Sequence, residues 1–409
     1  MAAMCPEPRI SRGQCFCVVP SLVSVQKLSA EGFSSAAWTT IIEPGDELAG
    51  LLMLTLGSKT SLDLLIARAS ARSIAQRVLA TEHAELARMR FGRFESTIED
   101  SLNRWLPRLS KTAVENALKV AAACGAAFVC QDDEVWPSSL SDLGLGTPAG
   151  LWVRGNLAAI TPSVAIVGSR TATGYGNWVC AEFVAALAER GIAVVSGGAF
   201  GIDAAVHRSA NAMGAPNFAV MAGGVDQFYP SSNADLLRSV TSNGAVLSEL
   251  PPGARPTRWR FLQRNRLIAT LGRATVVVEA GHRSGAINTA NHANSIGRPV
   301  GAVPGQISQS TSDGCHRLIR DGFATLLAGP RDLIELAGFA QVELAESPTL
   351  GVLELRALDA LTGRFQEQQA IAKRAGMTGI ELAIALGGLE LGGRAERNEQ
   401  GSWRKRLNL

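Results

Sequence analysis

The residues whose chemistry is easiest to interpret are arginines gathered in one short stretch, residues 255–273. This stretch contains no acidic residue, and two aromatic residues, Trp259 and Phe261, are interleaved with the cations. The arginines are Arg255, Arg258, Arg260, Arg264, Arg266 and Arg273. A guanidinium group binds phosphate oxygens through a planar fork, and an aromatic ring stacks on a nucleobase of any kind. The stretch therefore predicts contacts with a nucleic-acid backbone, with a solvated basic helix as the alternative.

The spacing at the centre of this stretch fits a helix with one apolar face. On such a helix Arg260 and Arg264 lie one turn apart on one flank of that face, and Arg266 lies on the other. The apolar face is expected to pack, and the arginines are expected to border it. Because Glu249 and Glu279 are the nearest acidic residues in sequence, we expect no local ion pairing to account for the charge.

Three loops rich in small residues offer places for phosphates. Each follows an apolar run, and the loops begin at Gly168, Ser196 and Glu279. Small residues let a phosphate approach backbone N–H groups, and the helix that begins after each loop presents further N–H groups. In the first loop Arg170 adds a charged fork, and in the third Ser284 precedes the helix. The loops predict anion binding at one edge of a sheet.

Residues for catalysis or for a cofactor are not evident in these loops. The first loop lacks GxGxxG, and the second strand does not end in an acidic residue that would bind a ribose, which argues against a dinucleotide. We interpret Asp203 as a cap of the following helix rather than as a catalytic carboxylate. His282 has no nucleophile or paired carboxylate in the neighbouring motifs and is expected to be a hydrogen-bond donor in its loop. We therefore predict no catalytic residue and no cofactor.

Composition narrows the class of protein. With 409 residues, 46% of them hydrophobic and 18% charged, the chain fits a folded α/β protein of two or three domains. Its net charge is only +3, so any affinity for nucleic acid must come from local clusters. The seven cysteines include no CxxC pair, and Cys15 and Cys17 have no second pair nearby. We therefore expect reduced thiols, no metal and a cytoplasmic protein, and no apolar run is long enough to predict a membrane span.

The elements that must position the loops alternate along the middle of the chain. Short apolar runs, separated by helical stretches, lie at residues 164–167, 192–195, 218–221, 245–247, 274–278 and 299–303. Continuous apolar strands between helices predict a parallel sheet covered on both faces, which is an extended Rossmann-like, doubly wound α/β domain. In such a sheet the three loops meet at the carboxyl edge.

The flanking segments have different patterns. Before the sheet, helical periodicity occurs at residues 46–56, 61–87 and 110–124, and a connector with several prolines follows at residues 132–156. After the sheet, the order of helix, turn, helix and polar hairpin at residues 368–404 suits a small winged helix. Its second helix contains Glu381 and no Lys or Arg. Three hypotheses for this winged helix therefore remain: it binds a DNA groove, it contacts a protein, or its role is purely structural.

Taken together, the motifs resemble the DNA-processing protein A family, also called DprA or Smf, from about residue 132 to residue 338. The segments that carry the resemblance are VAIVGSR, VVSGGAFGIDAAVH, AVMAGGVDQFYP, SELPPGARPTRWRFLQRNRLIATL, VVVEAGHRSGAINTA and GRPVGAVPG. The chain departs from the family pattern at Gly314-Cys315-His316, where the family usually has Gly-Thr-Asn, and at Gly272, where a Ser is expected. The residues before Trp38 match nothing in the family.

The resemblance implies a protein that binds single-stranded DNA, forms a homodimer and loads RecA recombinase onto DNA during natural transformation. It establishes no cofactor and no catalytic activity. The expected order of domains is a disordered or mis-assigned leader at 1–37, a SAM-like helical domain at 38–131, the Rossmann domain at 132–338, a linker at 339–350 and a winged helix at 351–409. The positions that match the family's DNA-binding residues are Gly168, Ser169, Arg170, Ser196, Gly197, Gly198, Gly201, Arg264, Asn265, Arg266, Ser284 and Gly285.

Two other functions compete with this hypothesis. One is a nucleotide or nucleoside-monophosphate hydrolase, similar to the cytokinin-activating phosphoribohydrolases, which share the Rossmann architecture. Those enzymes carry PGGxGTxxE, and the equivalent-looking stretch here, residues 281–288, has no such glutamate. The other is an interaction protein with a vestigial Rossmann domain, against which the intact loops and the excess of arginine argue.

Overall fold

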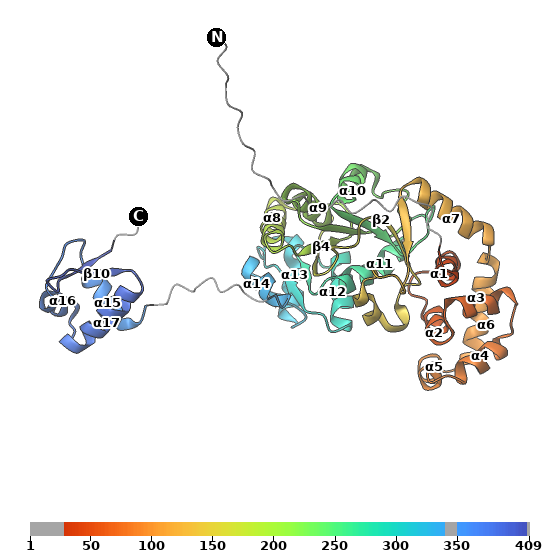
Figure 1. Cartoon of the computed structure of the whole chain (residues 1–409), viewed down its shortest axis with the longest axis horizontal. Coiled ribbons are helices and arrows are strands. Elements are labelled where there is room, and N and C mark those ends of the chain that lie inside the picture. The colour runs from red at the N-terminus through yellow and green to blue at the C-terminus, as the bar shows by residue number, and fades with distance from the viewer. Residues whose placement is uncertain (1–27, 340–349, 407–409) are drawn as a thin grey trace, which may run out of the picture. The chain divides into compact units, whose positions relative to one another are not determined.

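The chain forms two compact units, residues 1–339 and 340–409, and the computed structural model describes residues 28–339 and 350–406 (Figure 1). Most of the expected leader, including Cys5, Cys15 and Cys17, lies outside the described residues, as does nearly all of the expected linker. No described helix alone is long and apolar enough to cross a membrane, and the bent pair Glu47–Leu56 and Ser58–Ile66 meets that test only when combined.

The centre of the first unit is a sheet of nine strands within residues 28–339, in the order β1-β2-β6-β5-β4-β3-β7-β8-β9. From β6 to β9, neighbouring strands are parallel. They are β3 (Ser163–Val167), β4 (Ala193–Ser196), β5 (Asn217–Val220), β6 (Gly244–Ser248), β7 (Thr275–Val277), β8 (Val300–Ala302) and β9 (Thr325–Leu326). Every residue of β3 to β8 is buried. The doubly wound α/β fold expected from the apolar runs is confirmed.

Helices cover both faces of this sheet. Because successive side chains of a strand point to opposite faces, Ala165 and Val167 of β3 join one core, and Val164 and Ile166 join the other. The first core includes side chains from α11 (Arg258–Leu271), α12 (Gly285–Ser295) and α13 (Asp313–Arg320). The second includes side chains from α8 (Gly174–Ala188), α9 (Ile202–Met213) and α14 (Pro330–Leu336), and α10 (Ala234–Val240) packs beside α9.

Three strands of this sheet, β9 and two that precede β3, were not expected from the sequence. The strands β1 (Ala126–Val129) and β2 (Leu151–Gly155) add to the sheet in antiparallel fashion beside β6, and β2 lies inside the proline-rich connector. The ring of Phe128 packs 5.0 Å from that of Trp152. The Trp152 indole N–H also donates to Thr39 Oγ1 at 3.1 Å, buried between sheet and helices. The helical region and the sheet therefore share one hydrophobic core.

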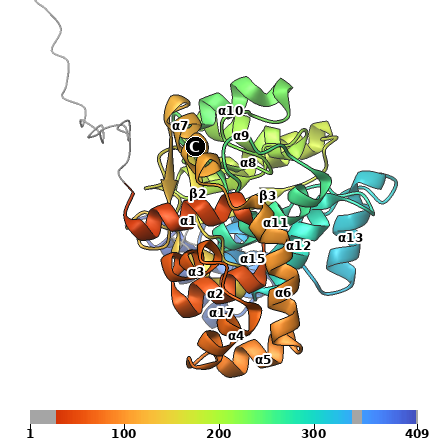
Figure 2. The same cartoon turned by 90° about the vertical axis from the view of Figure 1, so that its right-hand side faces the viewer.

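Seven helices, counted within residues 28–125, form the region before the sheet, which faces the viewer in Figure 2. They are α1 (Ala30–Ile41), α2 (Glu47–Leu56), α3 (Ser58–Ile66), α4 (Ala71–Leu79), α5 (Ala84–Phe91), α6 (Phe94–Trp105) and α7 (Lys111–Ala123). The expected single helix over residues 61–87 is wrong, because Arg68 adopts a φ of 51° and Ser70 caps a new helix. The first helix begins at Ala30, so the last residues of the expected leader are part of the folded unit.

The second unit is a small helical domain with a hairpin. It contains α15 (Val352–Ala360), α16 (Gln368–Ala375), α17 (Gly379–Leu391) and the paired strands β10 (Ala395–Arg397) and β11 (Trp403–Lys405). Gly376, at a φ of 62°, ends α16 in the left-handed conformation that glycine adopts without strain. Thr378 and Glu381 form a capping box at the start of α17. The helices and hairpin expected at this end of the chain are confirmed.

Candidate nucleic-acid interface

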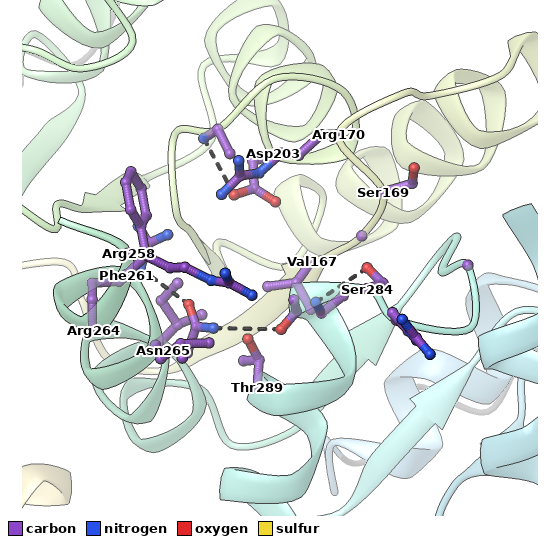
Figure 3. A pocket seen from close by; sticks show the side chains of 18 of the residues that line it. Val167, Ser169, Arg170, Asp203, Arg258, Phe261, Arg264, Asn265, Ser284 and Thr289 are labelled. Carbon is purple, nitrogen blue, oxygen red and sulfur yellow. Dashed lines mark hydrogen bonds between the residues drawn. The ribbon is translucent and has the colours of Figure 1, made fainter. Parts of the chain in front are cut away.

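A pocket of about 830 Å³ lies where the strand order of the sheet reverses, between β3 and β7. Connections leave these two strands in opposite directions across the sheet, which opens a crevice at their carboxyl ends. The pocket is lined by residues 167–171 after β3, residues 281–286 after β7, and the first turns of α11 (Figure 3). The first and third predicted anion loops and the arginine-rich helix therefore meet at one site.

The predicted binding residues divide into two groups at this pocket. Those that line it are Gly168, Ser169, Arg170, Arg264, Asn265, Ser284 and Gly285. Those that do not line it are Ser196, Gly197, Gly198, Gly201 and Arg266. The second group belongs mostly to the loop after β4, of which Ala199 lines the pocket.

The glycines of that supporting loop are required by close packing. A Cβ atom on Gly201, whose φ is 73°, would lie 2.2 Å from the carbonyl oxygen of Ser169. A Cβ atom on Gly197 would lie 2.6 Å from the guanidinium nitrogens of Arg264. Neither position has room for a larger residue, so the glycines let the second loop pack against the first loop and against Arg264.

Arg264 is a buried cation at the floor of the pocket. Its side chain is 6% exposed, and its Nη1 donates to the carbonyl oxygens of Gly197 (2.7 Å) and Val220. Burial lowers the pKa of Arg264 to about 10, with Asp203 opposing that shift and Arg170 adding to it. The guanidinium is therefore still charged at neutral pH, and backbone carbonyls hold it in place.

Arg266 and Arg260 are neutralised by carboxylates. The Nη2 of Arg266 donates to both oxygens of Glu249, at 2.6 and 2.5 Å, and both side chains are nearly buried. Arg260 makes a two-pronged pair with Glu43, at 2.8 and 2.9 Å. The expectation that ion pairing does not account for the charge is wrong for these two residues. Folding brings β6 and the turn after α1 beside α11, which sequence spacing alone does not reveal.

The expected placement of the arginines at the border of a packed face is also wrong for two of them. Arg264 and Arg266 lie inside the packed layer, since residues 264–271 of α11 are all buried. Asn265 is buried with them, and its Nδ2 donates to Asn288 Oδ1 of α12 at 3.0 Å. The second half of α11 therefore braces the floor of the pocket, and its first turns face the pocket opening.

Three other arginines at the pocket have no carboxylate partner within residues 28–339 or 350–406: Arg170, Arg258 and Arg283. All three side chains are exposed. Arg170 lies 5.4 Å from the ring centroid of Phe261, and Arg264 lies 5.7 Å from it. Sequence reasoning did not select Arg283, although its place next to Ser284 in the third loop was a signal that could have found it.

Asp203 does not cap α9 as expected. Gly201 occupies the cap position and has no side chain to do so, whereas Asp203 lies within the first turn. Its carboxylate accepts a hydrogen bond of 3.3 Å from the backbone N–H of Ala199, upstream of the helix. Asp203 therefore fixes the glycine loop, and it contributes the one carboxylate among the described residues that line the pocket.

Two of the helices that start at or beside the pocket, α8 and α12, differ in the groups that accept hydrogen bonds from their N-termini. At α8 the buried carboxylate of Glu279 accepts hydrogen bonds from the backbone N–H (3.0 Å) and the hydroxyl (2.5 Å) of Thr173. At α12 the cap is the neutral hydroxyl of Ser284, which accepts from Ala286 N at 3.3 Å. Since a helix N-terminus carries partial positive charge, α12 is the better place for a bound anion.

Comparison with known proteins shows the family of this chain. The family model of DNA recombination-mediator protein A matches residues 127–338, just over half of the 409 residues. The chain belongs to this family.

Individual relatives are similar over a comparable or longer part of the chain. A putative DNA processing protein DprA from Mycobacterium tuberculosis is 42% identical over 277 residues, which cover 64% of this chain and 70% of that protein. DNA processing protein DprA from Streptococcus pneumoniae is 39% identical over 204 residues, covering 50% and 72%. The X-ray structure of the Streptococcus pneumoniae protein matches with a TM-score of 0.58 at 27% identity, covering 76% of this chain and 98% of that one.

In the C-terminal unit of this DNA recombination-mediator protein A family member, the basic residues of the helix-turn-helix lie on α16, with Lys373 and Arg374 in its last turn, and not on α17. The second helix of its helix-turn-helix, α17, contains two glutamates and no Lys or Arg. Its exposed side chains include Ile380, Ile384 and Leu391, which are 76%, 67% and 93% exposed. Recognition of a DNA groove relies on polar and basic side chains along such a helix, so α17 lacks the residues for that task.

Proposed function

We propose that this recombination-mediator protein binds single-stranded DNA across the pocket between β3 and β7. The observation that carries the proposal is the convergence of Arg170, Arg258 and Arg283, which come from three separate elements and have no carboxylate partner in the described chain. Exposed cations without partners attract a polyanion, whereas Arg260 and Arg266 are already neutralised.

The pocket supports contact with a single strand through both backbone and base. Phosphates would be held by Arg258 and Arg283 and by the seven predicted residues that line the pocket. Among these seven, the buried charge of Arg264 would strengthen the positive electrostatic potential at the floor of the pocket. The ring of Phe261 and the exposed ring of Trp259 would stack on bases. Ser196, Gly197, Gly198, Gly201 and Arg266 would act indirectly by fixing the shape of the site.

Binding is expected to favour single-stranded over double-stranded DNA and to depend little on base sequence, because phosphates and ring faces are common to all bases while stacked pairs in a duplex hide their faces. The measurement is fluorescence anisotropy with labelled oligothymidine, a mixed-sequence strand and a blunt duplex at matched salt. Equal affinity for the duplex and the single strands would contradict the proposal.

We further propose that the protein acts without catalysis or a cofactor. Among the described residues lining the pocket, the one carboxylate, Asp203, is engaged by the backbone of Ala199. Acid–base hydrolysis of a glycosidic bond normally uses a pair of carboxylates. The exposed His282 contacts Arg317, at 3.4 Å, rather than a carboxylate that would orient it.

As a recombination mediator, the protein is proposed to act as a homodimer that loads RecA on single-stranded DNA, as in natural transformation. Membership of the family supports this step. On DNA coated with a single-strand-binding protein, addition of the chain should shorten the lag before RecA hydrolyses ATP, and Arg170→Ala should lengthen it again. If the lag is unchanged while DNA binding is intact, the protein binds DNA without helping RecA to load, which would contradict the loading role.

A further inference from the structure

Two aromatic rings are stacked on the exposed surface of the first turns of α8. Tyr175 and Trp178 are 44% and 59% exposed, with ring centroids 6.2 Å apart and an angle of 29° between their planes. The hydroxyl of Tyr175 donates to the carbonyl oxygen of Pro304 at 2.9 Å. This hydrogen bond fixes the first ring, and the second ring stacks on it. The result is a preformed aromatic surface rather than two independently mobile side chains.

This aromatic pair lies next to the pocket along the chain and in the fold. Thr171, which lines the pocket, precedes Tyr175 by four residues, and Thr173 between them is bonded to Glu279 at the start of the third loop. Pro304 follows β8, the strand next to β7, so it belongs to the same carboxyl edge of the sheet. In Figure 3, Phe261 and Arg258 lie on one side of the pocket, and Ser169, which leads to α8, lies on the other.

We propose that the path of single-stranded DNA continues from the pocket onto α8, where a base stacks on Trp178 beside Tyr175. This proposal rests on the proposed function and adds a second binding site for bases, opposite the one formed by Trp259 and Phe261. A strand crossing the pocket would meet an aromatic surface at each side, with the phosphates between them held over Arg170 and Arg283.

The charges around the aromatic pair favour a polyanion as its occupant. Arg170 and Arg283, on two of the loops that line the pocket, have no carboxylate partner in the described chain. Glu279, the carboxylate that acts on the pKa of Tyr175, is 3% exposed and accepts hydrogen bonds from Thr173. The exposed Glu182 lies one turn after Trp178 on α8, so the attraction for a phosphate comes from the pocket side of the pair. Stacking on an exposed ring requires only the face of a base, which any nucleotide provides.

The test measures the affinity of the full chain for oligothymidines of increasing length. Trp178→Ala should weaken binding of long strands by about 5-fold to about 150-fold, the range for loss of one stacked base. Strands too short to extend beyond the pocket should bind the variant and the wild type equally. Trp178→Phe keeps a ring and should recover most of the affinity for long strands. Met89→Ala changes an exposed apolar residue of α5, far from the pocket in the chain, and serves as the control.

Three outcomes would overturn the proposal. Equal binding of Trp178→Ala and the wild type at every length, while Arg170→Ala binds weakly, would remove the aromatic pair from the DNA path and leave the proposed function standing. A loss that is the same for short and long strands would place Trp178 within the pocket site instead of beyond it. Failure of the wild type to bind any strand would reject both the extended path and the proposed function.

Discussion

Replacing Arg170, Arg258 and Arg283 together with alanine should flatten the slope of log affinity against log salt concentration by about 2. Each cation that neutralises one phosphate of a single strand releases counterions and contributes roughly 0.7 to that slope. The three side chains are exposed and have no carboxylate partner in the described chain, so no internal ion pair is lost with them. The measurement is a salt titration of oligothymidine affinity for each single variant and for the triple variant.

Arg273 provides the matched control for this titration. It is also exposed, but it lies against the ring of Phe339, 4.8 Å from the centroid, and does not line the pocket. Arg273→Ala should therefore leave the slope unchanged, and thermal unfolding should show that all variants remain folded. An unchanged slope in the triple variant would mean that the DNA backbone does not run through this pocket.

Replacing Glu249 with glutamine should lower the free energy of unfolding of the first unit by about 3–5 kcal/mol. The change leaves the charge of Arg266 buried without a carboxylate, and breaking a buried pair on one side carries a cost of this order. The cost is not relieved locally, because Nε and Nη1 of Arg266 already have no hydrogen-bond partner among the described protein atoms. The measurement is urea unfolding, monitored by both circular dichroism and tryptophan fluorescence.

Two further variants test whether the loss of stability comes from the buried, unpaired charge of Arg266. The double variant Glu249→Leu with Arg266→Met removes both charges and should recover most of the lost stability. Asp142→Ala breaks a pair with Arg298 in which the carboxylate is 47% exposed, and it should cost no more than about 1 kcal/mol. A loss for Glu249→Gln as small as that for Asp142→Ala would show that Arg266 is not held in place by its charge partner.

The main elements of the fold could be predicted from local patterns, and the failures have identifiable causes. Buried parallel strands are apolar along their whole length, which made β3 to β8 visible as short runs. By contrast, β1 is a short segment next to a helix, and β2 lies within a proline-rich connector. Both form strands because they extend an existing sheet edge. The break at Arg68 depends on a single residue in the left-handed conformation, which hydrophobic periodicity does not detect.

The meeting of glycine loops and arginines could be predicted from the order of the motifs along the chain, because loops that follow parallel strands share the carboxyl edge of a sheet. Packing of the folded chain sets which arginines remain available to a ligand. Arg264 and Arg266 differ from Arg170 and Arg258 neither in residue type nor in local charge, yet the first two are buried and the others exposed. The partners that neutralise Arg260 and Arg266 are Glu43 and Glu249, which reach α11 from other elements. Charge pairing acts through space over a few ångströms, so its pattern is set by packing and not by distance along the chain.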